Sequence, residues 1–240
     1  MKIIIVKNYI ELSALAADFI CDTLIRNSSA TLGLATGSTP LGAYSHLRDR
    51  CSSGQISFKN VKVFNLDEYV ELHPNSVHSY AHFMKVNLFD GTDMDLRDFH
   101  IPCGNADDLD AECKRYDRLL SANPRNLQLL GLGSNGHIAF NEPLTPFERR
   151  THVVELAAST VADNSRLFEN DSQVPRRAIT MGIRDIVAAE RILLLASGIN
   201  KAQAVLNMIK GEVSVDCPAS VLQRHPDATV IIDGDAASLL

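Results

Sequence analysis

Apolar and polar residues follow one another along the chain in two patterns, which predict strands and helices in turn. Short apolar or β-branched runs, typical of strands, occur at residues 2–6, 31–35, 61–66, 127–130, 151–156, 178–181, 191–196 and 229–233. Apolar residues at helical spacing lie between these runs, at residues 12–24, 41–51, 76–89, 107–120, 161–168 and 200–210. No internal repeat, linker or low-complexity tract interrupts the order.

Local signals mark several helix ends. Asn8 followed by Glu11 is a capping-box pattern, Thr39 is a candidate N-cap with Pro40 as the first helical residue, and Gly211 follows the helix predicted to end at residue 210. The alternation of strands and helices predicts an α/β fold, in which a single-domain, doubly wound, mainly parallel sheet carries helices on both faces, as in Rossmann-like proteins. We expect residues 1–240 to form this one domain.

The net charge, the cysteines and the first apolar run limit the partners and the cellular compartment to be expected. A net charge of -6 argues against a nucleic-acid or anionic-membrane partner, because both need clustered lysine and arginine. The five cysteines are scattered, without a CxxC pair or a zinc-like spacing, and are therefore expected to be reduced thiols of a cytoplasmic protein. The apolar run at residues 2–6 is too short for a signal sequence or a membrane span.

The segment Thr36-Gly37-Ser38-Thr39-Pro40 is a candidate anion site. It follows a predicted strand and opens a predicted helix, where free backbone N–H groups and the helix dipole favour a negative charge. Two hydroxyls and a glycine suit a phosphate, although the spacing of a Walker A loop is missing. A plain helix cap is the alternative interpretation.

Three charged residues also stand at suggestive places. Asp67 follows the predicted strand 61–66, so its carboxylate is expected at the carboxyl edge of the sheet, where a base can meet a substrate. Arg166 and Lys201 are candidate cations, and Lys201 stands at a predicted helix start, where a bound anion would offset the unfavourable dipole. The alternatives are a loop-capping acid and ordinary surface charges.

The glycine-rich segment 131–143 is the main candidate for catalysis. Its Gly131-x-Gly133-x-x-Gly136 spacing formally matches a dinucleotide fingerprint, but the segment runs into His-Ile-Ala-Phe-Asn-Glu-Pro instead of opening a helix, which argues against a nicotinamide enzyme. His137 and Glu142 lie five residues apart, close enough on a turn for the carboxylate to orient the imidazole. A capped turn with a structural histidine is the alternative.

Four stretches together resemble the glucosamine-6-phosphate deaminase family. They are GLATGSTP at residues 33–40, FNLDEY at 64–69, GHIAFNEP at 136–143 and SGINKA at 197–202. The resemblance spans nearly the whole chain, and GHIAFNEP is a highly specific string. It implies an enzyme that converts glucosamine 6-phosphate and water into fructose 6-phosphate and ammonium, with an amino sugar phosphate as its small-molecule substrate and neither a metal nor a redox cofactor.

The resemblance also implies a role for each matching residue. Asp67 would carry the proton from C2 to C1 of the opened sugar, and His137, held by Glu142, would protonate the ring oxygen. Asn135 belongs to the same ring-opening group, where some members have aspartate; an amide can orient His137 but cannot supply a charge. The residues expected to hold the 6-phosphate are Gly37, Ser38, Thr39, Arg166 and Lys201.

The residues after Arg150-Thr151 bear on regulation. Hexameric members that respond to N-acetylglucosamine 6-phosphate carry basic residues shortly after an Arg-Thr pair and have a longer C-terminus. This chain has His152 and Val154 after Arg150-Thr151 and ends at Leu240, so a monomer without that allosteric site is expected.

One alternative function is that of 6-phosphogluconolactonase, which shares the fold but would have arginine after the Asp-Glu pair. The other is a non-catalytic sugar-phosphate sensor, whose DNA-binding helix-turn-helix would not fit into residues 1–7.

Overall fold

The main sheet of the protein is parallel throughout. The computed structural model describes residues 1–240 except residue 74 and residues 158–174. Its main sheet has the strand order β1-β10-β9-β6-β2-β3-β5, and each neighbouring pair is parallel. The predicted mainly parallel sheet is therefore confirmed. Its strands are β1 (Lys2–Val6), β2 (Thr31–Leu34), β3 (Lys62–Asn65), β5 (Phe99–His100), β6 (Leu127–Gly131), β9 (Ile192–Ala196) and β10 (Ala228–Asp233).

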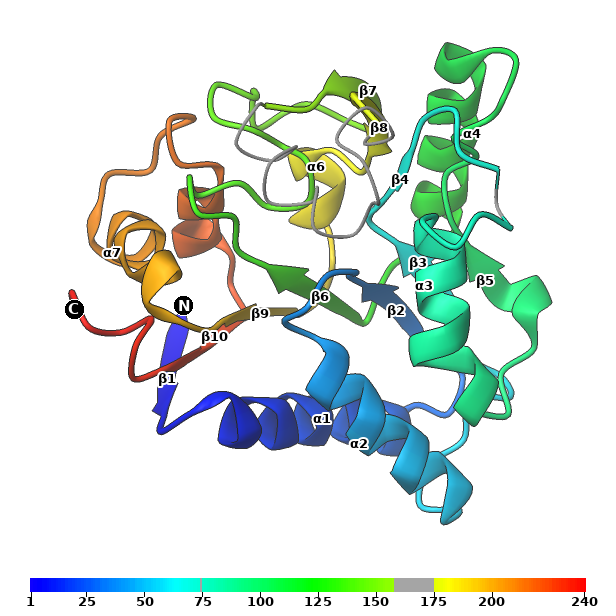
Figure 1. Cartoon of the computed structure of the whole chain (residues 1–240), viewed down its shortest axis with the longest axis horizontal. Coiled ribbons are helices and arrows are strands. Elements are labelled where there is room, and N and C mark those ends of the chain that lie inside the picture. Colours follow the sequence, from blue (N-terminus) through cyan, green and yellow to red (C-terminus); the bar gives the residue numbers. More distant parts are fainter. Residues whose placement is uncertain (74, 158–174) are drawn as a thin grey trace.

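Helices cover both faces of this sheet, as the sequence predicted. Figure 1 shows α1 and α2 along one face, with α6 and a smaller sheet above the other. Because both faces are covered, the central strands carry continuous apolar runs, and β9 is buried at every position. The helices are α1 (Tyr9–Arg26), α2 (Leu41–Ser52), α3 (Tyr80–Asn87), α4 (Leu109–Ala122), α6 (Ile183–Ile186) and α7 (Ala202–Lys210), with 3₁₀ turns at η1 (Phe89–Gly91), η2 (Leu96–Asp98), η4 (Ile199–Lys201) and η5 (Pro218–Arg224).

A side chain caps the start of α1, as predicted, but none caps the start of α2. At α1, the Asn8 side-chain oxygen accepts hydrogen bonds from the backbone N–H groups of Ile10 and Glu11, which confirms the predicted cap. The Glu11 carboxylate accepts from the Lys7 N–H, one residue earlier than a full capping box requires. At α2 the prediction was wrong. Pro40 is the N-cap residue and no side chain caps the helix, so the Thr39 hydroxyl is not used for capping.

Two other helices are shorter at their starts than the periodicity predicted. Helix α3 begins at Tyr80 because the Ser79 hydroxyl accepts a hydrogen bond from the His82 N–H and so caps it there. Helix α4 begins at Leu109 because the Asp108 carboxylate caps the Ala111 N–H. The helix predicted at residues 161–168 lies outside the described residues. Within the described part of the chain, no helix combines the length and the apolar character that a membrane crossing requires.

A second, antiparallel sheet of three strands was not predicted. Its order is β4-β8-β7, built from β4 (Asp67–Tyr69), β8 (Arg177–Thr180) and β7 (His152–Glu155). The apolar run at 61–66 predicted one strand, but β3 ends at Asn65 and the Leu66 carbonyl accepts a hydrogen bond from the Met181 N–H at 2.7 Å. The chain therefore leaves the main sheet at Leu66, and Asp67 enters the smaller one.

The topology creates a crevice at the carboxyl edge of the main sheet. From β2 the chain builds outward in one direction, to β3 and β5, and it then returns to β6 beside β2 and builds in the other direction, to β9 and β10. In open α/β sheets, ligands bind where the direction of winding reverses. The loop after β2 and the turn after β6 leave the sheet on the two sides of this point.

Candidate active site

A cavity of about 280 Å³ occupies the crevice between the ends of β2 and β6. Segments that are far apart in the sequence line it, because most of them follow a strand of the main sheet that ends at this edge. The lining residues are Ala35, Thr36, Gly37, Ser38, Thr39, Leu66, Asp67, Tyr80, Gly131, Leu132, Gly133, His137, Ala139, Phe140, Ser197, Asn200 and Lys201.

The loop after β2 presents backbone and hydroxyl groups to this cavity. Gly37 has a φ of 94°, a left-handed conformation that favours glycine, and it turns the chain between β2 and α2. The Tyr9 hydroxyl holds the loop from behind. It donates to the Ser38 carbonyl at 3.1 Å and accepts from the Gly42 N–H at 2.9 Å. The loop is therefore fixed on the side away from the cavity, with its Ser38 and Thr39 side chains at the cavity wall.

Lys201 reaches the same cavity from the loop after β9. It is the N-cap residue of α7, and Ser197 and Asn200 line the cavity beside it. The Asp233 carboxylate, at the end of β10, accepts hydrogen bonds from the Ser197 hydroxyl and the Gly198 N–H, which fixes the start of this loop. Two neighbouring strand ends thus place a cation opposite the loop after β2.

The turn after β6 contains a relay of three side chains. The Asn135 amide nitrogen donates to the Glu142 carboxylate at 2.7 Å, and its oxygen lies 2.8 Å from Nδ1 of His137. Nδ1 of His137 lies 3.5 Å from Glu142 Oε2. Because an amide oxygen only accepts hydrogen bonds, neutral His137 carries its proton on Nδ1, and Nε2 remains available for proton exchange.

Two glycines explain why the turn matches a dinucleotide fingerprint. A Cβ at Gly133 would lie 2.3 Å from the His137 ring, so only glycine lets the imidazole lie across the turn. Gly136 has a φ of 88°, and a Cβ there would meet the Cys217 sulfur at 2.7 Å. The glycines therefore serve the placement of His137 instead of the approach of a pyrophosphate to a helix.

Asp67 faces the cavity from β4, and only 5% of its surface is exposed. Burial raises the pKa of its carboxyl well above the usual range, and the adjacent Glu68 carboxylate raises it further. Glu68 is held by hydrogen bonds from the backbone N–H groups of Tyr69, Tyr80 and Ala81. Burial also raises the pKa of Glu68, although these hydrogen bonds oppose the rise. The site thus contains a desolvated carboxyl beside a second buried one, a combination suited to a general base.

The residues predicted from the sequence fall into three groups in the structure. The cavity brings together Gly37, Ser38, Thr39, Asp67, His137 and Lys201. Asn135 and Glu142 lie behind His137 and contact it instead of the cavity. Arg166 lies outside the described residues. The roles assigned to these residues remain predictions.

Sequence reasoning missed Tyr80, which lines the cavity and whose ring stacks with that of Phe140 in the turn. Its hydroxyl donates to the Tyr69 hydroxyl at 3.1 Å, and its N–H donates to Glu68. A tyrosine at the start of a short helix is indistinguishable by pattern from a core tyrosine. The signal that identifies it is its contact with the Asp67-Glu68 pair, and only the folded structure reveals this contact.

Comparisons with known proteins agree with this arrangement. Residues 9–231 match the family model described as glucosamine-6-phosphate isomerases/6-phosphogluconolactonase. A glucosamine-6-phosphate deaminase of Thermoanaerobacter pseudethanolicus is 48% identical over 100% of this chain and 95% of its own length. The solved structure of a monomeric glucosamine-6-phosphate deaminase is 46% identical, with a TM-score of 0.98 and full coverage of both chains.

A 6-phosphogluconolactonase from Trypanosoma brucei shares the fold with a TM-score of 0.79, but it is only 19% identical over 100% of this chain and 98% of its own. At that identity the likeness shows the fold alone. The strand order, the cavity and the match of residues 9–231 to the family model agree. The chain therefore belongs to the family of glucosamine-6-phosphate isomerases and 6-phosphogluconolactonases.

Proposed function

We propose that this chain converts glucosamine 6-phosphate and water into fructose 6-phosphate and ammonium. The observation that carries the proposal is that the buried carboxylate of Asp67 and the His137 turn line one cavity together with a phosphate-sized loop. The reaction is that of the deaminases to which the chain is 46% and 48% identical over its full length.

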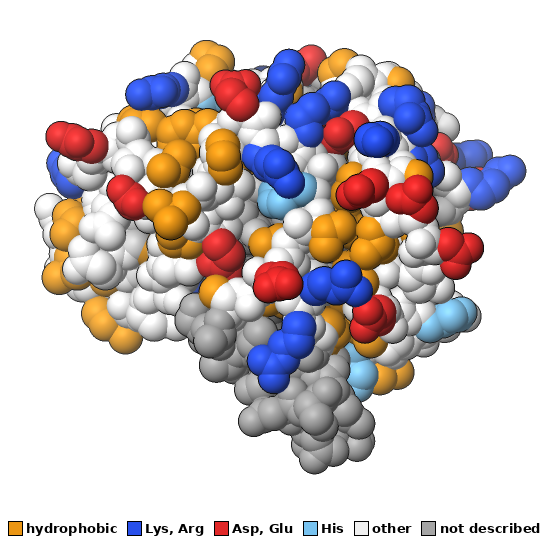
Figure 2. Space-filling model, turned by 90° about the horizontal axis from the view of Figure 1, so that it is seen from above, with side chains coloured by type: hydrophobic (Ala, Val, Ile, Leu, Met, Phe, Trp, Pro, Cys, Tyr) orange, Lys and Arg blue, Asp and Glu red, His pale blue; other side chains and the backbone are white. Residues whose placement is uncertain are grey.

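The phosphate group anchors the substrate. The amides around Gly37 and the hydroxyls of Ser38 and Thr39 donate hydrogen bonds to the phosphate on one side of the cavity. Lys201 binds it from the other side, with Arg166 as a second cation. Acidic and basic side chains are interspersed over the described part of the face shown in Figure 2, so the phosphate is held by local groups and not by a broad basic surface.

Ring opening comes next and belongs to His137. Protonated at Nε2, the imidazole gives its proton to the ring oxygen as the bond between C1 and that oxygen breaks, and the C1 hydroxyl releases its proton to water. The Glu142 carboxylate lies beside the imidazole. Asn135 joins these two side chains and fixes the ring orientation. Opening the ring exposes the C1 aldehyde and makes the C2 proton acidic enough for a carboxylate to remove.

Asp67 then acts as the base of the isomerisation. It removes the proton from C2 while a proton passes from the ammonium group of the substrate to the C1 carbonyl oxygen, which gives an enolamine. The protonated Asp67 then returns its proton to C1, and this leaves an iminium at C2. Water adds to the iminium carbon and the C–N bond breaks, so that the nitrogen leaves as ammonium and C2 becomes the ketone of fructose 6-phosphate. Because burial raises the pKa of Asp67, its carboxylate binds a proton more strongly than an exposed one would.

The two alternative functions use less of this machinery. A lactonase hydrolyses the ester of a closed ring and needs no base at C2, whereas here the buried carboxylate of Asp67 lines the cavity. A sensor needs the phosphate loop but gains nothing from a histidine relay that leaves Nε2 available. The deaminase reaction alone uses the loop, the relay and the base.

We also propose the domain organisation, the cellular location and the oligomeric state of the chain. The 240 residues act as one catalytic domain, in the cytoplasm, where the five free cysteines stay reduced. The chain acts as a monomer, like the 46% identical deaminase described as monomeric. It responds to no N-acetylated sugar phosphate at residues 150–154, because the Arg150 guanidinium is already paired with Asp185 and Asp117.

Direct assay tests the reaction. Purified protein mixed with glucosamine 6-phosphate should release ammonium and fructose 6-phosphate in equal amounts, as measured by coupled enzymatic assays. Asp67→Asn should lower kcat by at least about 100-fold, because the amide cannot accept the C2 proton. Asp18→Asn, which alters an exposed carboxylate on α1, is the control and should retain activity. No product from the wild type, or undiminished turnover in Asp67→Asn, would overturn the assignment.

A further inference from the structure

The proposed base and the proposed ring-opening turn come from different sheets. Asp67 begins β4 of the smaller sheet, whereas the turn at residues 131–143 follows β6 of the main sheet. The reaction needs both groups on one sugar, so their separation must be fixed to a fraction of an ångström. Within the described part of the chain, the side-chain hydrogen bonds of Thr180 and Asn141 link these parts, and both lead to the end of β8.

Thr180 provides the first link. It is fully buried, and in the antiparallel pairing of β4 with β8 it lies directly opposite Asp67. Its hydroxyl oxygen accepts a hydrogen bond from the Phe140 N–H at 3.1 Å. Phe140 stands in the turn between His137 and Glu142 and lines the cavity. One side chain therefore joins the strand partner of the base to the middle of the ring-opening turn.

Asn141 provides the second link, from the turn to the residue after β8. It is fully buried, and its amide nitrogen donates at 2.9 Å to the Ile138 carbonyl within the turn and at 2.9 Å to the Met181 carbonyl. The Met181 N–H in turn donates to the carbonyl of Leu66, the residue before Asp67, at 2.7 Å. Both links thus run from the turn through β8 to the start of β4.

We propose that Thr180 and Asn141 are positioning residues, which set the distance between Asp67 and His137 by attaching the ring-opening turn to β8. The inference rests on the proposed function, since it assigns these two residues a place in that reaction. Neither residue lines the cavity, so neither contacts the substrate. The phosphate-binding groups lie on the loops after β2 and β9, which do not depend on these links.

This arrangement predicts a particular kinetic effect. Loosening the turn relative to β8 misplaces the reacting groups but leaves the phosphate grip intact, so kcat falls and KM stays near its original value. Misplacement by about 1 Å can cost ~100-fold in rate. A residue with a merely structural role would instead lower thermal stability and the fraction of active protein without a selective loss of kcat.

Two substitutions at one position separate these possibilities. Thr180→Val keeps the shape of the side chain but removes the oxygen that accepts from Phe140, whereas Thr180→Ser keeps the oxygen and removes a packed methyl group. Both variants should lose thermal stability. Only Thr180→Val should lose kcat, by ~10- to 100-fold with KM within about twofold, while Thr180→Ser should stay within about threefold. Active-site titration or a fold probe should confirm that both are folded.

Thr23 on α1 provides the control, because its hydroxyl is also buried and hydrogen-bonded to the backbone. Thr23→Val removes a buried hydroxyl on α1, where it donates to the Phe19 carbonyl, and should leave kcat unchanged. Should Thr180→Val not fold, Thr180→Ala leaves room for a water molecule on the Phe140 N–H and serves the same comparison. A Thr180 variant lacking the hydroxyl with kcat within about twofold of wild type, or equal losses in the serine and valine variants, overturns the inference. A wild type that releases no ammonium overturns the proposed function, and with it this inference.

Discussion

At the scale of single residues, the raised pKa of the buried Asp67 carboxyl suits a base but lowers the stability of the folded protein as pH rises. An Asp carboxyl in an unfolded chain loses its proton near pH 4. In the folded protein, burial and then the Glu68 charge raise the pKa of Asp67, so the folded state keeps the proton to higher pH. Between these two pH values the folded state binds more protons than the unfolded state, and stability falls as pH rises.

Asp67→Asn should therefore stabilise the protein although it lowers kcat. The amide has nearly the same shape but never has to ionise inside the protein. Near pH 4 the melting temperatures of variant and wild type should be similar. At pH 8 the variant should melt higher by at least about 2 °C, which corresponds to ~1 kcal/mol in a chain of this size. Differential scanning calorimetry at both pH values measures the difference.

Asp233→Asn is the matched control, with the opposite sign. Burial favours the neutral form of Asp233, but hydrogen bonds from the Ser197 hydroxyl and from the N–H groups of Ala236 and Gly198 outweigh it and lower the pKa. Its stabilisation is present above the unfolded-state pKa and is lost as pH falls through the folded value. Asp233→Asn should thus lower the melting temperature at pH 8 and less so at low pH. A destabilised Asp67→Asn at pH 8 would contradict the account of Asp67.

The sequence predicted those site residues that lie next to strand ends. Asp67, His137 and the Gly37 loop could be found because a polar residue after an apolar run is a local pattern. Tyr80 and Thr180 could not, because the first lies on a short helix and the second ends a strand of a sheet that no periodicity predicted. Their importance comes from contacts with residues more than ten positions away in the sequence.

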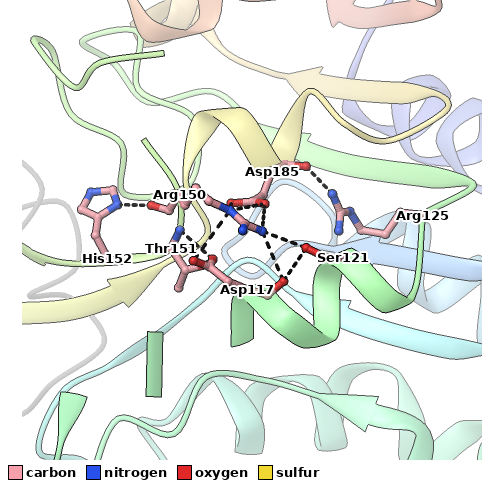
Figure 3. A network of polar contacts seen from close by, with 7 residues as sticks. All are labelled: Asp117, Ser121, Arg125, Arg150, Thr151, His152 and Asp185. Atoms are coloured by element: carbon pink, nitrogen blue, oxygen red, sulfur yellow. Dashed lines mark hydrogen bonds and ion pairs between the residues drawn. The ribbon is translucent and has the colours of Figure 1, made fainter. Parts of the chain in front are cut away.

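At the scale of elements, a polar network holds the smaller sheet against α4 and α6. Figure 3 shows the Arg150 guanidinium pointing toward Asp185 on α6 and toward Asp117 and Ser121 on α4. Its Nη2 atom lies 2.9 Å from Asp185 Oδ1 and 3.0 Å from the Ser121 hydroxyl. The Asp117 carboxylate also accepts from the Thr151 N–H at 3.1 Å, just before β7. The network fixes the start of β7, the strand that supports β8.

Arg150→Lys should weaken this attachment although the charge is conserved. A lysine has one amino group, so it cannot donate to Asp185 from two nitrogens, as Nε and Nη2 of Arg150 do, and reach Ser121 as well. The Arg150 side chain is 39% exposed, so solvent screens the pair and the loss should be modest, about 1 kcal/mol of unfolding free energy. Urea denaturation followed by circular dichroism measures it.

The same substitution at an exposed pair provides the comparison. Arg97 bonds Asp95 two residues away, and its side chain is 90% exposed. Arg97→Lys should cause no measurable loss of stability, because water replaces these contacts readily. Equal midpoints for Arg150→Lys and wild type would mean that the network contributes nothing to the attachment of β7.

Most elements could be predicted because each reflects a local pattern, whereas the smaller sheet depends on contacts between distant residues. The run at residues 61–66 indicates a strand correctly, but nothing local indicates that the chain changes sheets at Leu66. That change depends on the hydrogen bond between the Leu66 carbonyl and Met181, more than a hundred residues later. The pairing of β4, β7 and β8 is likewise long-range, and so the smaller sheet escaped prediction.

At the scale of the whole molecule, the smaller sheet completes a site that the main sheet begins. The main sheet provides the crevice between β2 and β6, with a loop for an anion and a turn for a histidine. It places no base there, because β3 ends before Asp67. By leaving the main sheet at Leu66, the chain brings Asp67 into β4 and pairs that strand with β8, which also holds the turn that contains His137.

The proposed absence of allosteric control is tested on the intact protein. Arg150 is neutralised by Asp185 and Asp117, and burial lowers the pKa of the adjacent His152, so that residue stays neutral near pH 7 and offers no charge to a phosphate. Rate against glucosamine 6-phosphate should be hyperbolic and unchanged by N-acetylglucosamine 6-phosphate at concentrations well below those that compete at the active site. Light scattering should give a mass near 26.3 kDa at every stage. A sigmoidal curve that the N-acetylated sugar makes hyperbolic, or a mass several times larger, would show that effector binding and assembly use surfaces other than the Arg150 network.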